Sequence, residues 1–238
     1  MQLFRSILSR RMLALILCAV LIYVNAFTSV KVFAKVCTNQ PAFRCTANKQ
    51  AEADQAHNND LAITAKAAVL IDNASGRILY AKNKDKKLIP ASITKIMTLL
   101  LIFESIEQGK CKLEDKVTVS EYAASMGGSQ VFLEPGETQD VNTMIKCISI
   151  ASANDAAVAM AEHLAGSEQS FVKRMNKKAK ALGMKHTHFK NCNGLDDSIE
   201  SGHYSSAYDV ALMSQSLVSK YPDISKYSTV WMDTITHV

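Results

Sequence analysis

The segment PASITKIMTLLLIF, residues 90–103, restricts the fold of this chain more than any other. Between positions 96 and 103 only Thr98 is polar, whereas a helix on a protein surface shows polar residues at regular intervals. The segment therefore predicts a helix that is buried on nearly all sides. Ser92 and Lys95 stand three residues apart at its start, so they are expected to share one face of the helix.

The first 34 residues have the features of a secretory signal peptide. A basic start is followed by an apolar run, Met12–Val24, that is too short to span a membrane comfortably. Small-residue cleavage patterns end at Ala26 and at Ala34. An uncleaved membrane anchor is the alternative. A lipoprotein signal at Cys18 is disfavoured, because the residue before it is bulky.

The positive charge of the chain is concentrated in this leader. The whole chain has 27 basic and 22 acidic residues, a net charge of +5. Residues 1–34 contain four basic and no acidic residues, so their removal leaves a net charge of +1. The exported part therefore shows no basic excess of the kind that nucleic-acid binding requires, and we expect no nucleic-acid partner.

The rest of the chain divides into a polar linker and one domain. Residues 35–60 are polar and show no apolar period, which is typical of a tail or linker. Residues 61–238 are predicted to form the domain, with enough apolar residues (48% of the chain) for one core.

Five cysteines remain after the leader, and an odd number in an exported protein leaves at least one outside an internal disulfide. Cys37 and Cys45 are close enough to pair locally. Cys147 lies in an apolar segment and is interpreted as a small buried side chain. Cys111 and Cys192 show no zinc-site spacing with the others, and we expect none of the five to be catalytic.

The domain shows strands near its two ends and helices between them. The expected strands are 67–72 and 77–82, joined as a hairpin, then 117–119 and the tail STVWMDTITHV. The expected helices after the apolar one are 141–149, 155–164, 168–182 and 206–219. This order fits a sheet with strands from both ends of the chain and an inserted helical subdomain, the apolar helix covering the hairpin.

Ser92 and Lys95 are candidates for nucleophilic catalysis. The start of a helix offers free N–H groups and a positive dipole end that can stabilise an oxyanion. Burial lowers the pKa of a lysine, as a lysine general base requires. The alternative is a helix-capping serine with a surface lysine. A second Ser-x-x-Lys, Ser170 and Lys173, falls in a charged amphipathic helix and is interpreted as solvent-exposed.

Ser152-Ala153-Asn154 lies at the junction between two expected helices. A hydroxyl and a carboxamide presented by a short loop can relay a proton and hold a substrate amide. Taken alone, the tripeptide is typical of an ordinary capping loop. Together with Ser92 and Lys95 it matches two of the three motifs of penicillin-binding proteins and β-lactamases.

Several segments, in the same order, resemble serine-type D-Ala-D-Ala carboxypeptidases, the low-molecular-weight penicillin-binding proteins. They are AAVLIDNASGRILYAKN, PASITKIMT, VTVSEYAASMGGSQVFLEPGE, SANDAAVAMAEHLAGS and HFKNCNGLDDSIESGHYSSAYDVALM. The resemblance covers residues 61–238. It implies an α/β (α+β) fold of the β-lactamase/transpeptidase type, with a mainly antiparallel sheet flanked by helices and a helical subdomain.

The resemblance also implies a mechanism and partners. Ser92 would attack the D-Ala-D-Ala bond of peptidoglycan stem peptides with Lys95 as base. Ser152 would relay a proton and Asn154 would hold the substrate. β-Lactams would be covalent inhibitors, no cofactor or metal would take part, and the protein would act in the cell wall or at the outer face of the cytoplasmic membrane. The oligomeric state is left open.

The family's third motif, Lys-Thr-Gly, does not occur in this sequence. The resemblance places it on a sheet strand beyond residue 238, so we expect a truncated domain without its final strands. We also expect such a domain to aggregate, to acylate poorly, and to expose residues such as Leu99, Leu100 and Leu101. A non-catalytic wall-binding fragment is therefore an alternative reading.

For each of the other possible activities, a single feature of the sequence is informative. A β-lactamase or transpeptidase of the same superfamily stays an alternative, although position 153 is Ala, where a class A β-lactamase has Asp. A Ser-His-Asp hydrolase is disfavoured because the chain has no Gly-x-Ser-x-Gly. His186 and His188 alternate in sequence, but no third ligand stands near them, so a metal site there is disfavoured.

Overall fold

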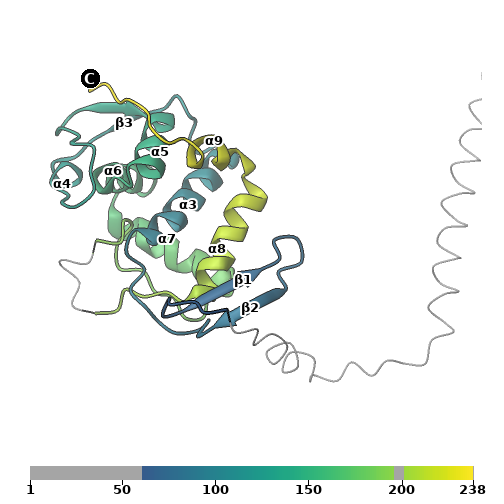
Figure 1. Cartoon of the computed structure of the whole chain (residues 1–238). Helices are drawn as coiled ribbons and strands as arrows, with labels where there is room; N and C mark the ends of the chain where they lie inside the picture. The colour runs from purple at the N-terminus through teal and green to yellow at the C-terminus, as the bar shows by residue number, and fades with distance from the viewer. Residues whose placement is uncertain (1–60, 196–200, 238) are drawn as a thin grey trace, which may run out of the picture. The chain divides into compact units, whose positions relative to one another are not determined.

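A computed structural model of the chain describes residues 61–195 and 201–237 (Figure 1). The predicted signal peptide, the linker and the Cys37–Cys45 pair lie outside these residues. Within the described part of the chain, no helix combines the length and the apolar character that a membrane crossing requires.

Strands and helices follow one another in an order close to the predicted one. The elements are β1 (Ala68–Ile71), β2 (Ile78–Lys82), the 3-10 turn η1 (Ala91–Thr94), α3 (Lys95–Glu107), β3 (Lys116–Thr118), α4 (Glu121–Ala124), β4 (Thr138–Asp140), α5 (Val141–Ile150), α6 (Asn154–Ala165), α7 (Glu168–Ala181), α8 (Ala207–Lys220), η2 (Pro222–Ile224) and α9 (Ser225–Ser228).

The predicted hairpin is confirmed. β1 and β2 pair antiparallel, with Ala68 opposite Lys82 and Leu70 opposite Tyr80. The turn closes with a hydrogen bond of 2.8 Å from the Gly76 N–H to the Asp72 carbonyl, and Gly76 has a φ of +69° that favours glycine. α8 packs against β1, whereas α3, the expected cover, packs mainly against other helices (Figure 1).

The apolar helix α3 forms the centre of the core, as its sequence predicts. It packs against α5, α6, α7 and α8 (Figure 1). Leu99, Leu100 and Leu101 are 8%, 0% and 8% exposed, so the expectation that they would be uncovered is wrong. Four helices pack around α3, and their side chains cover these three leucines without any contribution from further sheet strands.

Side-chain caps explain where several helices begin. Asp140 accepts a hydrogen bond of 2.7 Å from the Thr143 N–H at the start of α5. Ser206 accepts one of 3.2 Å from the Asp209 N–H at the start of α8. α6 ends at Ala165, and Gly166, with a φ of +77°, caps it.

The strand predicted for the end of the chain is not formed within residues 229–237. β3 pairs instead with β4, a strand that the sequence did not predict. Single contacts fix the tail: Asp233 forms an ion pair of 2.8 Å with Lys146, and the Thr236 carbonyl accepts a hydrogen bond of 2.8 Å from Gln139. Within residues 229–237, the backbone hydrogen bonds run only to the preceding turn, at Thr229 and Val230, and none pairs the tail with a strand.

Candidate active site

Ser92 and Lys95 lie on successive elements of one helical segment. Ser92 is exposed in η1, and Lys95 is the first residue of α3 and only 3% exposed. We expected Ser92 to be at the start of the α-helix. It lies instead in the 3-10 turn that directly precedes the helix. The Lys95 Nζ lies 3.2 Å from the Ser92 Oγ, so both groups face the same point.

Three oxygen atoms surround the Lys95 amino group. Nζ donates 2.6 Å to the Asn154 Oδ1 and 2.8 Å to the Asn193 carbonyl, in addition to its contact with Ser92. An amide oxygen and a backbone carbonyl can only accept, whereas a hydroxyl can also donate. A neutral Lys95 would thus keep its two N–H bonds to Asn154 and Asn193, and its lone pair would face the Ser92 hydroxyl.

Burial makes this neutral form accessible. Desolvation lowers the pKa of Lys95 from 10.5 to about 8, against the opposing effects of Cys192 and Asp155. A lysine base with a pKa near the working pH can take a proton and return it. The alternative of a surface lysine is excluded, because Lys95 is only 3% exposed, and the arrangement can activate Ser92.

Asn154 is held at both ends of its carboxamide. While Oδ1 accepts from Lys95, Nδ2 donates 2.8 Å to the Gly127 carbonyl. It is the first residue of α6 and not part of a loop, and its side chain is 4% exposed. In this structure Asn154 orients Lys95, a contact that the sequence did not predict.

Ser152 lies between α5 and α6, as predicted, with a φ of +55° that is uncommon outside glycine. Among the hydrogen bonds of residues 61–195 and 201–237, none joins its hydroxyl to Ser92 or Lys95. The structure thus places Asn154 against Lys95 but leaves Ser152 outside the bonded cluster.

A third segment completes the cluster; it belongs to the family-like block HFKNCNGLDDSIESGHYSSAYDVALM, whose residues had no expected role in the site. Gly194 has a φ of +85°, and a Cβ there would lie 1.8 Å from the Ala91 carbonyl oxygen. Ala91 itself has a φ of +45° immediately before Ser92. The Asn193–Gly194 pair thus supplies a carbonyl to Lys95 and packs against the backbone that carries Ser92. A glycine in an Asn-Gly pair is a turn signal, and together with the family-like block around it this pair could have marked the segment.

A buried histidine contacts η1, the turn that carries Ser92. The Thr94 Oγ1 lies 2.9 Å from the His203 Nε2, and the His203 Nδ1 accepts 3.0 Å from the Lys190 N–H. Because Nδ1 accepts, the neutral ring carries its proton on Nε2 and donates to Thr94. His203 is 5% exposed, and although it lies in a family-like block, its contact with Thr94 was not expected from the sequence.

The other candidates stay apart from this cluster. The Ser170 Oγ bonds to Ser167 within the first turn of α7, and Lys173 is exposed, as predicted. His186 lies 3.6 Å from Asp85, and the His188 Nδ1 lies 2.6 Å from the Gly202 carbonyl.

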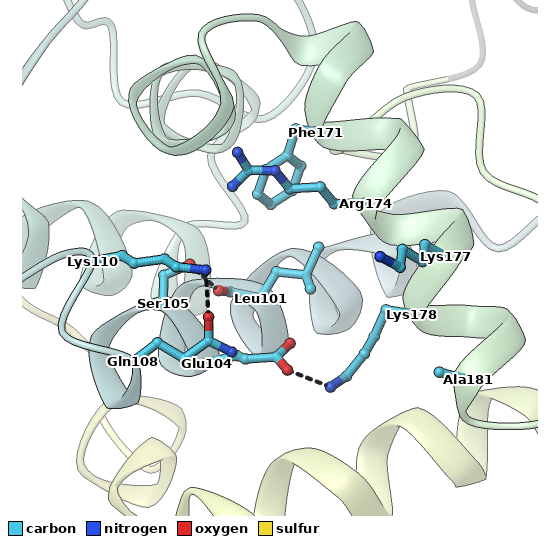
Figure 2. A pocket seen from close by; sticks show the side chains of 10 residues that line it. All are labelled: Leu101, Glu104, Ser105, Gln108, Lys110, Phe171, Arg174, Lys177, Lys178 and Ala181. Carbon is cyan, nitrogen blue, oxygen red and sulfur yellow. Dashed lines mark hydrogen bonds and ion pairs between the residues drawn. The ribbon is translucent and has the colours of Figure 1, made fainter.

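A groove of about 490 Å³ lies between α3 and α7 and does not include Ser92 or Lys95 (Figure 2). Its rim is mainly basic, with Arg174, Lys177 and Lys178, and Lys178 forms an ion pair of 2.8 Å with Glu104. The groove is therefore separate from the reactive cluster.

Comparison with known proteins places this geometry in a family context. Residues 50–238 match the family model described as D-alanyl-D-alanine carboxypeptidase. The chain is 56% identical over 183 residues to D-alanyl-D-alanine carboxypeptidase DacF of Bacillus subtilis, covering 77% of this chain and 46% of that protein. The chain thus spans about half the length of this relative.

Solved structures agree. D-alanyl-D-alanine carboxypeptidase DacD from Francisella tularensis superposes with a TM-score of 0.67 at 36% identity, covering 70% of this chain and 40% of that one. Penicillin-binding protein D2 from Listeria monocytogenes in its ampicillin-bound form superposes with a TM-score of 0.64 at 28% identity, covering 71% and 68%. The expected penicillin-binding-protein fold is confirmed.

Proposed function

The chain belongs to the D-alanyl-D-alanine carboxypeptidase family, and from this membership and the Ser92–Lys95 geometry we propose that it removes the terminal D-alanine from peptidoglycan stem peptides through a covalent acyl-enzyme. The observation that carries the proposal is the buried Lys95 Nζ, 3.2 Å from the Ser92 Oγ and with a pKa lowered to about 8.

In the acylation step, neutral Lys95 takes the Ser92 hydroxyl proton while Oγ bonds to the carbonyl carbon between the two D-alanines. The oxyanion forms beside the N-terminal end of α3, where the positive end of the helix dipole stabilises negative charge. Collapse of this intermediate breaks the C–N bond. The proton leaves Lys95 and passes through Ser152 to the amine of the departing D-alanine.

Deacylation returns the enzyme to its starting state. A water molecule attacks the ester carbonyl, its proton goes to Lys95, and the Ser92 oxygen leaves and recovers that proton. Through both steps, the 2.6 Å hydrogen bond to Asn154 holds the Lys95 amino group in position beside Ser92. The sequence-based role of Asn154, holding a substrate amide, requires that its carboxamide exchange one of its two present partners.

β-Lactams would react at the same serine. Their amide opens on attack, but the amine stays tethered to the acyl group, so the acyl-enzyme persists. The ampicillin-bound form of the Listeria monocytogenes relative supports this part of the proposal.

The proposal includes a location. Residues 1–34 would direct export, and the protein would act in the cell wall or on the outer face of the cytoplasmic membrane. Removal of terminal D-alanine limits the peptides available for crosslinking, and through this effect the protein would contribute to cell shape.

The test compares two serines that share the Ser-x-x-Lys spacing. Ser92→Ala should abolish covalent labelling by a fluorescent penicillin and release of D-alanine from a D-Ala-D-Ala peptide. Ser170→Ala, the matched control in α7, should keep both. Labelling of the Ser92 variant at the wild-type level would refute the assignment of the nucleophile.

The same assay separates the alternatives. Labelling without D-alanine release would favour a penicillin-binding protein that does not trim peptides. Fast turnover of penicillin would favour a β-lactamase, and transfer of the acyl group to an added amine would favour a transpeptidase.

A further inference from the structure

The structure brings three potential metal ligands together away from Ser92. They are the Cys111 thiol, the Asp115 carboxylate and the His163 imidazole, and their ligand atoms all lie within 4.8 Å of one another. Cys111 and Asp115 belong to the connection between α3 and β3, and His163 lies in the last turn of α6. The cysteine spacing predicted no zinc site, because these ligands meet only through the packing of α3 beside α6.

We propose that Cys111, Asp115 and His163 form a binding site for a thiolate-preferring divalent transition metal, with Zn²⁺ as the reference ion. Sulfur, imidazole nitrogen and carboxylate oxygen are the three donor types that zinc takes in proteins. Three protein ligands leave the fourth tetrahedral position for water. The proposal is independent of the carboxypeptidase activity.

The distances suit such a site after a small contraction. Tetrahedral zinc with ordinary bond lengths sets its ligand atoms about 3.4–3.6 Å apart. Because the ligand atoms of the cluster lie within 4.8 Å of one another, the contraction needed is at most about 1.4 Å. His163 is exposed and Asp115 is half-buried, so rotation of these two side chains can supply that movement while the buried Cys111 stays in place.

The surroundings of each donor agree with a ligand role. The Lys112 N–H donates 2.8 Å to one carboxylate oxygen of Asp115, and the second carboxylate oxygen can bind a metal. Among the interactions of the described residues, none engages the His163 ring. Metal binding would release the Cys111 thiol proton to solvent as the metal–sulfur bond forms.

A catalytic Cys-His-Asp triad is the competing interpretation, and the burial of the sulfur argues against it. Cys111 is 2% exposed, so a substrate carbonyl cannot reach it.

The position of the cluster predicts its effect on the fold. At their N-terminal ends, α3 and α6 are joined by the Lys95–Asn154 hydrogen bond. The cluster joins the opposite ends of the same two helices, since Cys111 follows α3 and His163 closes α6. A metal there would act as a second clamp across this pair of helices and raise the melting temperature.

The test uses the full chain, reduced and metal-free, titrated with Zn²⁺ against a chromophoric chelator and, separately, with Co²⁺. We expect Zn²⁺ to bind with a stoichiometry of one and to raise the melting temperature. Cys111→Ser and His163→Gln should each weaken binding by about ten-fold or more. Cys147→Ser, another buried thiol, and His186→Gln, another histidine beside an aspartate, are matched controls that should bind as the wild type does.

Co²⁺ identifies the sulfur directly. A thiolate–cobalt charge-transfer band in the near ultraviolet should form in the wild type and in Cys147→Ser, and should be lost in Cys111→Ser. Because His163 is exposed, His163→Gln should fold normally, as circular dichroism can verify, and its loss of affinity then cannot be ascribed to unfolding. Zn²⁺ affinity and stoichiometry that both Cys111→Ser and His163→Gln leave unchanged would overturn the proposal.

Discussion

The Asn154 Oδ1 accepts a hydrogen bond of 2.6 Å from the Lys95 Nζ and so joins the first residue of α6 to the first residue of α3. Each of these residues is the start of a helix in the core, so the hydrogen bond ties the position of the amino group to the packing of both helices. This relationship makes Asn154 a positioning residue for the proposed base.

Asn154→Asp should test that role. A carboxylate 2.6 Å from Lys95 would stabilise the ammonium form and raise the pKa of Lys95, because opposite charges favour ionisation. We expect the rate of penicillin acylation at pH 7 to fall by about ten-fold or more and its pH profile to move to higher pH. Asn83→Asp, on the exposed end of the hairpin, should change neither. A lower rate with an unmoved pH profile would indicate a merely structural role.

The pH dependence of acylation should follow the proton on Lys95. With a pKa of about 8, the neutral fraction rises about fifty-fold between pH 6 and pH 8, and the acylation rate should rise with it. Stopped-flow labelling with a fluorescent penicillin, corrected for spontaneous penicillin hydrolysis, measures the rate. A rate independent of pH between 6 and 8 would contradict Lys95 as the base.

Folding stability should depend on pH through the same group. The pKa of Lys95 is about 8 in the folded protein and 10.5 as its ordinary value, so between these pH values the unfolded chain binds more protons than the folded one. Stability contributed by neutral Lys95 is therefore fully present above pH 10.5 and is lost as the pH falls through 8. Urea unfolding should show this rise between pH 8 and 10.5 in the wild type, and Lys95→Met should lack it.

Gly194→Ala should damage both stability and acylation. Its φ of +85° and the distance of 1.8 Å from a new Cβ to the Ala91 carbonyl oxygen force the turn that carries Ser92 to move. Gly109→Ala is the matched control, since Gly109 has a φ of +66° but no atom within 4 Å of a new Cβ. We expect a loss of about 1–2 kcal/mol for Gly109→Ala and about 1–3 kcal/mol more for Gly194→Ala. Equal losses in denaturant unfolding would refute the proposed close packing.

Thr94→Val should lower the free energy of unfolding, because Thr94 bonds to His203 beneath the turn that carries Ser92. It removes the 2.9 Å hydrogen bond to His203 and leaves a buried ring nitrogen without that partner. A loss of about 1–3 kcal/mol in unfolding free energy is expected. Thr118→Val on the exposed face of β3 should be nearly neutral. A neutral Thr94→Val would show that this bond contributes nothing to stability.

Local features were predictable because the sequence encodes them over short distances. The hairpin, α3, α5, α7 and α8 follow from apolar periodicity, capping residues and glycines that act within a few positions. Ser92 and Lys95 share a face because they are three residues apart in helical backbone. The tail was mispredicted because β-prone residues become a strand only where another strand accepts their backbone hydrogen bonds.

The tertiary structure decided what lies around the Ser92–Lys95 pair. The Asn193 carbonyl, Gly194 and His203 reach it from positions about a hundred residues away, and the metal-ligand cluster of Cys111, Asp115 and His163 is likewise assembled by helix packing. By itself the sequence determined a serine and a lysine at the start of a buried helix. Packing alone determined that the lysine is desolvated and that its lone pair can face the serine, because burial and long-range hydrogen bonds depend on which elements meet in space.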